Sequence, residues 1–369
     1  MSEKSLTIDE LETPAVIVDL DVLEANIARM SDYARRHALR LRPHTKTHKV
    51  PAIAQMQIAS GSHGITVAKS GEAEVMASAG LDNILLAYPI FGEKKLGRLA
   101  NLALEKKITI AIDGAVTAEA ISQAAHSAGS TINMLVELDV GMRRCGVASA
   151  EEAERLAKAV DQLPGVRFAG FNLYPGHIWA PPAEQMAPLR EVSAKLAEVL
   201  EKFSRSGLEC EIVSGGSTPT ALQSHFIAGL TEIRPGTYVL NDCNTLGVGA
   251  CSLADCALRV IVTVVSNAVP GRAIVDGGTK TFSSDRLLSG NREGFGHVTE
   301  YPDILFEGMS EEHGHLNISE TAHQPAVRER LSIDPNHVCA CVNLHDRIWY
   351  HRNGVVEGAW QVAGRGRVV

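Results

Sequence analysis

Residues 39–49 read LRLRPHTKTHK, a short alternating segment that leads into a cluster of cationic side chains. Leucine and arginine alternate over residues 39–42, which is the pattern of a half-buried strand, and Pro43 then ends regular strand pairing. Lys46 therefore stands just beyond the end of a strand. A lysine there can reach into a pocket, where cationic neighbours and partial burial favour the free amine that Schiff-base chemistry requires. For a lysine taken alone, a solvated basic loop is the alternative.

Short apolar, β-branched segments alternate with helical patterns through the first two thirds of the chain. Eight such strands with intervening helices predict a (β/α)8 barrel. A doubly wound open sheet is the alternative, but Asp19-Leu20-Asp21 follows the first strand in place of a GxGxxG turn. The expected strands are Ala15 to Asp19, Leu39 to Arg42, Gly64 to Ala68, Ile84 to Tyr88, Ile108 to Ile112, Met134 to Leu138, Phe168 to Leu173 and Glu211 to Val213.

After about residue 245 the pattern changes to short apolar runs, such as Leu258 to Val265 and Val338 to Leu344, separated by Gly, Pro, Asn and Asp. This pattern predicts an all-β domain. We therefore expect a barrel domain over residues 13–245 and a β domain over residues 246–369, with residues 1–12 packing on the β domain.

The composition is that of an ordinary soluble protein of about two domains, with 369 residues of which 45% are hydrophobic. A net charge of −8 provides no basic surface for nucleic acid or an anionic membrane. The amino terminus is polar, and the best apolar run, Val260 to Val265, is too short to span a bilayer. A cytoplasmic location is expected, with the seven cysteines as free thiols.

Two later segments are typical of phosphate binding. Ser214-Gly215-Gly216-Ser217-Thr218 follows the eighth expected strand, and Gly236-Thr237-Tyr238 comes shortly after it. Glycines beside hydroxyl side chains expose backbone N–H groups that can hold a phosphate at the last strands of a barrel. A structural loop is the alternative for this turn alone. Together with Lys46 at a strand end, it fits pyridoxal 5′-phosphate, which offers an aldehyde to the amine and a phosphate to the turn.

His337 and Cys339 form a second candidate site near the carboxyl terminus. On a strand, side chains two residues apart face the same side, so these two could bind one ion. Imidazole with thiolate suits zinc better than magnesium, and two protein ligands leave positions open for substrate oxygens. A buried thiol beside a hydrogen-bonded histidine is the alternative.

Two polar clusters near this site have less specific patterns. Glu311, Glu312 and His313 have acid/base potential, or form a polar surface turn. Asn343-Leu344-His345-Asp346 could orient a metal ligand, or form a turn after a strand.

These motifs, from about Thr13 onward, resemble the fold-type III pyridoxal-phosphate enzymes related to alanine racemase, in the branch of D-threonine aldolases and eukaryotic-type D-serine dehydratases. The resemblance implies that Lys46 is the Schiff-base lysine, that Arg144 lies near the cofactor's phenolic oxygen and that Tyr174 lies beside the cofactor. It assigns the phosphate to the turn at residues 214–218 and to residues 236–238. Arg234 fits the racemase position that faces the pyridine nitrogen, where metal-dependent relatives vary.

Within this resemblance, His337 and Cys339 occupy the positions of divalent metal ligands, which simple racemases lack. D-threonine aldolases of this branch carry Asp where Cys339 stands, whereas the D-serine and D-hydroxyaspartate dehydratases carry a His-x-Cys pair. The run Asn343 to Asp346, in contrast, is aldolase-like. These motifs therefore agree on the family but disagree on whether the reaction is that of an aldolase or that of a dehydratase.

The expected function is a lyase that depends on pyridoxal phosphate and a divalent metal (Zn, Mn or Mg) and acts on D-3-hydroxy amino acids. Retro-aldol cleavage, typified by D-threonine, is the first hypothesis, with His48 or metal-bound hydroxide as the base that removes the hydroxyl proton. Dehydration of D-serine or D-3-hydroxyaspartate is the alternative, with Lys46 removing the α-proton. A cofactor carrier without turnover and a racemase are the remaining alternatives. The family resemblance also implies a homodimer.

Overall fold

The structure, a computed structural model, describes residues 6–205, 207–288 and 293–369. The chain divides into two compact units. The sheet unit comprises Met1–Ala28, Thr47–Val50 and Thr237–Arg365, and the barrel unit comprises Arg29–Lys46, Pro51–Gly236 and Gly366–Val369. Each unit is thus assembled from separate segments of the sequence.

The barrel unit contains an eight-stranded sheet in the order β2-β9-β8-β7-β6-β5-β4-β3, in which every pairing is parallel. A parallel bridge between His44 and Thr66 joins the segment after β2 to β3, which connects the two edges of the sheet. The predicted (β/α)8 barrel is confirmed. The strands are β2 (Arg40–Leu41), β3 (Ile65–Val67), β4 (Asn83–Leu86), β5 (Lys107–Ile112), β6 (Ile132–Leu138), β7 (Val166–Leu173), β8 (Ile212–Gly215) and β9 (Glu232–Ile233).

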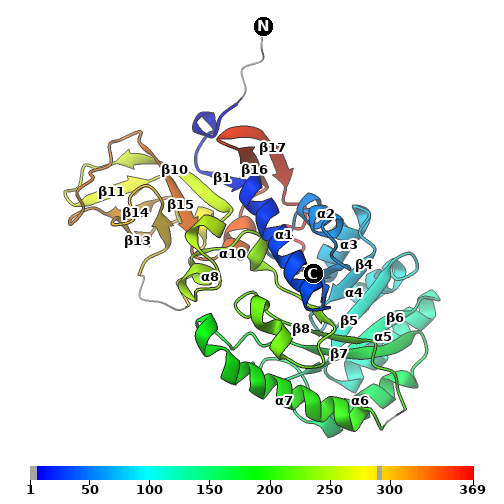
Figure 1. Cartoon of the computed structure of the whole chain (residues 1–369). Helices are drawn as coiled ribbons and strands as arrows, with labels where there is room; N and C mark the ends of the chain where they lie inside the picture. The colour runs from blue at the N-terminus through cyan, green and yellow to red at the C-terminus, as the bar shows by residue number, and fades with distance from the viewer. Residues whose placement is uncertain (1–5, 206, 289–292) are drawn as a thin grey trace. The chain divides into compact units, whose positions relative to one another are not determined.

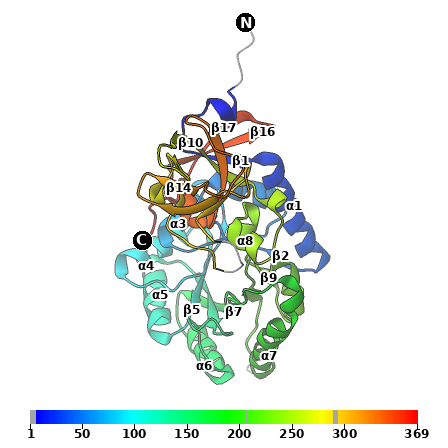
Figure 2. The same ribbon diagram turned by 90° about the vertical axis from the view of Figure 1, so that its left-hand side faces the viewer.

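Helices surround the barrel strands and bury apolar faces against them (Figure 2). Met76, Leu99, Val160 and Leu196 are fully or almost fully buried in this layer, which is the usual core of an α/β barrel. The helices are α2 (Pro51–Ala59), α3 (Ser70–Ser78), α4 (Glu93–Leu102), α5 (Ala115–Ala128), α6 (Ala150–Asp161) and α7 (Met186–Phe203), with short 3-10 turns at Pro182–Glu184 and Ala221–Phe226. Helix α1 (Leu20–Arg36) contains the boundary between the two units at Ala28.

The sheet unit contains a nine-stranded sheet in the order β11-β14-β13-β12-β15-β10-β1-β16-β17, and its pairings are antiparallel except for β1 with β16. The expected β domain is confirmed. Its strands are β1 (Ala15–Asp19), β10 (Leu258–Ser266), β11 (Arg272–Val275), β12 (Gly296–Val298), β13 (Leu305–Met309), β14 (Gly314–Asn317), β15 (Arg330–Pro335), β16 (Arg347–Arg352) and β17 (Val355–Gln361). Its short helices are α8 (Cys243–Gly247), α9 (Thr279–Phe282) and α10 (Val338–Val342), with 3-10 turns at Ile8–Glu10, Thr237–Val239 and Leu253–Asp255. Near the amino terminus, Ile8 N donates to Gly354 O at 2.9 Å, while residues 1–5 lie outside the described residues.

The prediction that Ala15–Asp19 is the first barrel strand is wrong. This strand, β1, pairs with β10 and β16 in the sheet unit, where the blue and red ends of the sequence lie side by side (Figure 1). The other seven predicted strands are β2 to β8, and the eighth place is taken by Glu232–Ile233. The apolar pattern of β1 suits either sheet, because it specifies burial and not the partner strand. Strand β9 contains one apolar residue and is flanked by Thr231 and Arg234, so its sequence shows no apolar pattern.

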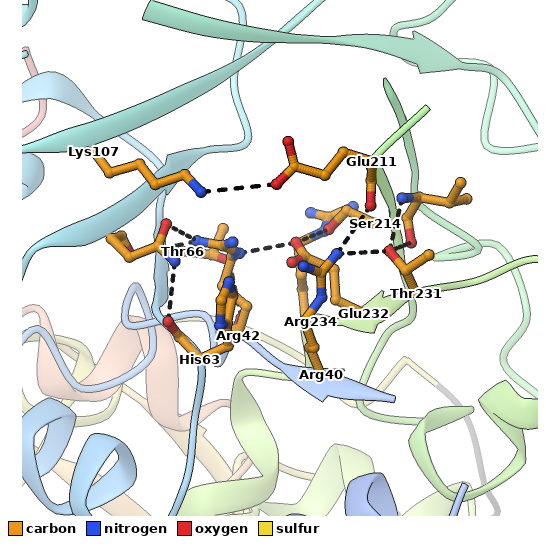
Figure 3. Close-up of polar contacts among 12 residues, drawn as sticks. Arg40, Arg42, His63, Thr66, Lys107, Glu211, Ser214, Thr231, Glu232 and Arg234 are labelled. Atoms are coloured by element: carbon orange, nitrogen blue, oxygen red, sulfur yellow. Dashed lines mark hydrogen bonds and ion pairs between the residues drawn. The ribbon is translucent and has the colours of Figure 1, made fainter. Parts of the chain in front are cut away.

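The interior of the barrel contains a buried ion pair (Figure 3). Arg42 Nε lies 2.8 Å from Glu232 Oε1, and the two side chains are 1% and 0% exposed. Asn83 Oδ1 accepts a hydrogen bond from Arg42 at 2.8 Å, and Ser214 Oγ donates to Glu232 at 2.7 Å. Burial raises the pKa of Glu232, but the charge and hydrogen bond of Arg42 and the hydrogen bond from Ser214 outweigh burial, so the pKa lies below its ordinary value. The barrel interior is therefore strongly polar at this level.

Within the described parts of the chain, no helix has both the length and the apolar character needed to cross a membrane.

Candidate active site

A cavity of about 220 Å³ lies in the barrel unit, and Lys46 lines it. Thr45 holds the segment before the lysine in place, because its N–H and hydroxyl both donate to Thr66 O, at 2.8 and 3.0 Å. Lys46 N also contacts His44 Nδ1 at 3.4 Å. The cavity brings together three of the predicted cofactor residues, Lys46, Arg144 and Tyr174. Its walls are formed by His44, Lys46, Ala68, Ala87, Tyr88, Pro89, Glu137, Arg144, Cys145, Asn172, Tyr174 and Arg234.

Arg144 and Tyr174 are neighbours in this cavity. The guanidinium carbon of Arg144 lies 5.0 Å from the centroid of the Tyr174 ring, within the range of a cation–π contact. The loop that carries Arg144 is organised by Asp139, whose Oδ1 accepts from Gly141 N at 3.0 Å and Arg143 N at 2.9 Å. A fixed cation beside an aromatic ring suits an anionic, planar ligand.

Two buried polar side chains, Asn172 and Arg234, line the same cavity together with the partly buried Glu137. Asn172 donates to Glu137, and Arg234 Nη2 donates to Leu173 O at 2.7 Å. Burial raises the pKa of Glu137, against the opposing charge of Arg234, the hydrogen bond from Asn172 and the charge of Arg144. Arg234 Nε and Asn172 Oδ1 are buried and have no hydrogen-bond partner among the described residues. Buried polar side chains without a full set of partners are uncommon, and these two belong to residues that line the cavity, which fits a polar ligand there.

Sequence reasoning did not identify Glu137 and Asn172 as cavity residues. Both lie within apolar strands, β6 and β7, rather than in the loops after them. The signal that could have identified them is a polar residue in the sequences INMLVEL and VRFAGFNL, where a buried polar group needs a partner.

The predicted phosphate turn begins at the end of β8. Gly216 has a φ of +89°, a conformation that favours glycine. Gly236 N donates to Thr218 Oγ1 at 3.2 Å, and Ser217 Oγ lies 3.0 Å from Thr220 Oγ1. The hydroxyl of Ser214, in contrast, donates to Glu232, so this side chain points into the barrel interior. The remaining residues of the turn are Gly215, Gly216, Ser217 and Thr218, whereas Thr237 and Tyr238 belong to the sheet unit.

These features fit pyridoxal phosphate. The barrel unit offers a lysine amine in a cavity, a glycine-rich turn after the last long strand, a cation beside a tyrosine ring and two unsatisfied buried polar atoms. An aldehyde, a phosphate and a polar aromatic ring would each find a suitable group among them.

The structure brings His337 and Cys339 together, although not on a strand as predicted. His337 is the residue before α10 and Cys339 lies in its first turn, directly after β15. The Cys339 thiol donates to Thr47 Oγ1 at 3.2 Å, and Thr47 follows Lys46 in the sequence. Burial lowers the pKa of His337, but its hydrogen bond to Cys339 and the charges of Cys339, Asp242 and Asp285 raise it to about 9.

An imidazole and a thiol in mutual contact are suitable ligands for a zinc-like ion. Among the described residues, no group of three or more His, Cys, Asp or Glu side chains has an arrangement that could hold a metal ion. The pair therefore fits an open site, in which other oxygens complete the coordination, rather than a closed structural site.

His48 does not line the cavity of Lys46. Its side chain is fully buried, and its Nδ1 accepts a hydrogen bond from Val50 N at 3.1 Å. His44, four residues earlier, lines the cavity instead.

The two other polar clusters take part in local contacts. Lys280 Nζ forms ion pairs with Glu311 and Glu312, each at 2.9 Å, on exposed side chains. Asn343 Oδ1 accepts from Lys49 Nζ at 2.8 Å, and His345 Nε2 lies 3.0 Å from Thr281 O. These contacts fit turns that stabilise the sheet unit.

Comparison with known proteins places this site in a family. Residues 18–242 match the family described as "Alanine racemase, N-terminal domain", and residues 257–351 match the "Putative serine dehydratase domain". The chain is 34% identical over 362 residues to a D-threonine aldolase of Arthrobacter sp, an alignment that covers 96% of this chain and 93% of that relative.

Two solved structures support the same assignment. The crystal structure of D-threonine aldolase from Filomicrobium marinum has a TM-score of 0.92 and 34% identity, with 100% of both chains covered. A D-threo-3-hydroxyaspartate dehydratase mutant in the metal-free form has a TM-score of 0.87 and 30% identity, with 96% of this chain and 98% of that chain covered. The chain therefore belongs to the fold-type III, alanine racemase-like family of pyridoxal-phosphate enzymes, in the branch that contains D-threonine aldolases and D-hydroxyaspartate and D-serine dehydratases.

Proposed function

We propose that this protein is a lyase that uses pyridoxal phosphate and a divalent metal to cleave D-3-hydroxy amino acids, with D-threonine as the typical substrate. The products are glycine and an aldehyde. The observation that carries the proposal is the cavity in which Lys46 lies with Arg144, Tyr174 and Arg234. Its support from relatives is the full-length similarity to D-threonine aldolases.

In this proposal the barrel unit binds and orients the cofactor. Lys46 supplies the amine that holds the aldehyde, and the turn at residues 215–218 holds the phosphate. Arg234, whose side chain lines the same cavity, would be a hydrogen-bond donor for the cofactor ring. When bound, pyridoxal phosphate acts as an electron sink for the bonds at Cα of an amino acid.

In the sheet unit, His337 and Cys339 are the proposed ligands of the divalent ion. A thiolate beside an imidazole favours zinc over magnesium, and manganese is a further candidate. The ion would supply Lewis-acid polarisation of a substrate oxygen, for which the β-hydroxyl is the group that the reaction requires. The two-residue ligand set suits that task because it leaves coordination positions open.

The aldolase reaction needs a base for the proton of the β-hydroxyl. His48 was the expectation from sequence, but it is fully buried and its Nδ1 accepts from a backbone N–H. We propose His44 instead, since its side chain lines the cavity and an imidazole can accept a proton near neutral pH.

Dehydration is the second candidate, and Cys339 is the residue that favours it. The His-x-Cys pair is the dehydratase pattern of this branch, and a D-threo-3-hydroxyaspartate dehydratase is among the similar structures. In that reaction Lys46 removes the α-proton, the hydroxyl leaves, and a 2-oxo acid and ammonia form. A cofactor carrier or a racemase would leave the His337–Cys339 pair without a role.

The products distinguish the two reactions. The purified protein, loaded with pyridoxal phosphate and Mn²⁺ or Zn²⁺, is incubated separately with D-threonine, D-serine and D-3-hydroxyaspartate. We expect acetaldehyde and glycine from D-threonine, and none from the Lys46→Ala variant. Pyruvate and ammonia from D-serine, with no aldehyde from any of the three substrates, would replace the aldolase assignment with dehydratase.

We further propose that the protein acts in the cytoplasm as a homodimer. None of the seven cysteines, all of which lie in the described parts of the chain, forms a disulfide, which suits a reducing compartment. The dimer rests on the family, and size-exclusion chromatography with light scattering tests it.

A further inference from the structure

Asp285 and His337 form a directed contact in the sheet unit. Asp285 Oδ2 lies 3.0 Å from His337 Nδ1, and the side chains are 45% and 35% exposed. At this distance the ring Nδ1–H donates to the carboxylate. In the metal-bound state this hydrogen bond would keep the ring proton on Nδ1 and leave Nε2 as the ligating nitrogen.

The placement of Asp285 depends on the residue next to the histidine. Asn336 Nδ2 donates to Asp285 O at 3.1 Å and to Gly294 O at 2.9 Å, and Asn336 is 3% exposed. A buried amide thus ties the segment of Asp285 to the segment that carries His337. The contact between the carboxylate and the imidazole therefore depends on buried backbone hydrogen bonds as well as on two half-exposed side chains.

A second carboxylate near His337 has a different task. Asp242 is buried, its Oδ2 accepts from Val338 N at 3.2 Å, and its Oδ1 accepts from Thr245 N at 2.9 Å. It thereby holds the backbone between His337 and Cys339. Of these two carboxylates, Asp285 is the one that contacts the imidazole ring of His337.

We propose that Asp285 is a positioning residue, which sets the tautomer and the ring orientation of His337 so that Nε2 is presented to a divalent ion. The inference rests on the proposed metal role of His337 and Cys339. In metal sites a carboxylate on the far nitrogen of a ligating histidine has this effect, and its removal weakens metal affinity by roughly 10–100-fold. If Asp285 were only an exposed ion pair, its removal would leave metal affinity unchanged.

The test measures metal affinity directly, on the protein loaded with pyridoxal phosphate. Competition with a chromophoric chelator gives the dissociation constants of Zn²⁺ and Mn²⁺. We expect Asp285→Ala to weaken both by roughly 10–100-fold. Asp285→Asn should lose less metal affinity than Asp285→Ala, because the amide oxygen of asparagine can still accept a hydrogen bond from Nδ1–H of His337. The matched control is Asp303→Ala, which removes an exposed carboxylate of the same unit.

Two further measurements distinguish an effect on the orientation of the metal ligand from an effect on the folding of the protein. The visible spectrum of the Co²⁺-loaded protein reports ligand geometry, and it should change in Asp285→Ala but not in Asp303→Ala. The cofactor absorption band and the Tm of the apo protein should stay close to wild type in both. Wild-type metal affinity and an unchanged Co²⁺ spectrum in Asp285→Ala, alongside loss of metal in His337→Ala, would overturn the inference and leave the proposed metal site intact. Absence of stoichiometric metal binding by the wild-type protein would overturn the metal site itself, and the inference with it.

Discussion

Replacement of Glu232 by glutamine removes one charge of the ion pair inside the barrel and leaves Arg42 as an uncompensated buried cation. The pair is separated by 2.8 Å and its side chains are 0% and 1% exposed, so water cannot replace the missing partner. Glutamine keeps an oxygen that can accept from Ser214, which donates to Glu232 in the wild type. The substitution therefore isolates the loss of charge.

Breaking a buried ion pair by removing one partner costs about 3–5 kcal/mol of unfolding free energy. In a unit of about 200 residues, 1 kcal/mol shifts the Tm by about 2–4 °C, so we expect a fall on the order of 10 °C. The double variant Arg42→Met/Glu232→Leu removes both charges and should recover most of that fall, because a buried ion pair gains little over an apolar pair of similar volume.

Thermal unfolding followed by circular dichroism tests this prediction. The control is Glu201→Gln, which removes the exposed i,i+4 partner of Arg205, a pair whose side chains are 77% and 72% exposed. The Tm of Glu201→Gln should be close to that of the wild type, because solvent screens the charges of an exposed ion pair. A Glu232→Gln protein that also unfolds close to wild type, or a double variant no more stable than the single one, would refute the reasoning.

The same pair has a defined pH dependence. The folded pKa of Glu232 lies below its ordinary value of about 4.3, so the pair stabilises the fold above that pH and loses its effect as the pH falls through the folded pKa. The stability difference between wild type and Glu232→Gln should therefore narrow below about pH 4. A difference that widens on acidification would contradict this sign.

Three further predictions concern the proposed site. Lys46→Ala should abolish the visible absorption of the lysine-linked cofactor, and retention of that band would move the attachment to another lysine. Cys339→Ala should leave the cofactor bound but weaken metal affinity by more than roughly 10–100-fold, which is the cost of losing a residue that only orients a ligand. The control Cys210→Ala should keep the metal. Wild-type metal content in Cys339→Ala would refute the proposal that Cys339 is a metal ligand. His44→Ala should lower kcat for D-threonine by roughly 10²–10⁴-fold, whereas His48→Ala should chiefly lower the Tm, and the opposite pattern would return the base to position 48.

The sequence was sufficient for most of the barrel. Seven of its strands have apolar segments long enough to show burial, and the lysine and the glycine-rich turn stand directly after two of them. Strand β9 was missed because the segment Thr231 to Arg234 has a single apolar residue, whereas the equally short β2 lies in the alternating run of residues 39–42. Strand β1 was identified but placed in the wrong sheet, because partners far apart in sequence, β10 and β16, determine its position.

In the candidate site too, residues in local sequence motifs were predictable, whereas contacts between residues far apart in the sequence were not. Lys46 could be predicted from its neighbours in the sequence, and Arg144 and Tyr174 from the resemblance to the family. Glu137 and Asn172 were missed: a polar residue within an apolar strand marks each of them, but their contact with each other is made across two adjacent strands and does not show in the sequence. The strand predicted around His337 and Cys339 is wrong: the segment is the short helix α10, and Asp242 accepts a hydrogen bond from its first N–H. That carboxylate lies almost a hundred residues earlier, so periodicity could not reveal it.

The position of β1 also means that this strand is synthesised long before the strands with which it pairs. Its partners β10 and β16 follow it by roughly 240 and 330 residues, and ribosomes add about 5–20 residues per second. The nascent β1 segment therefore waits for tens of seconds with an apolar edge unmatched, while strands β2 to β9 have all emerged and can close on one another. During that interval the β1 segment has the character of an unpaired apolar edge strand, which is the kind of segment that promotes misassembly.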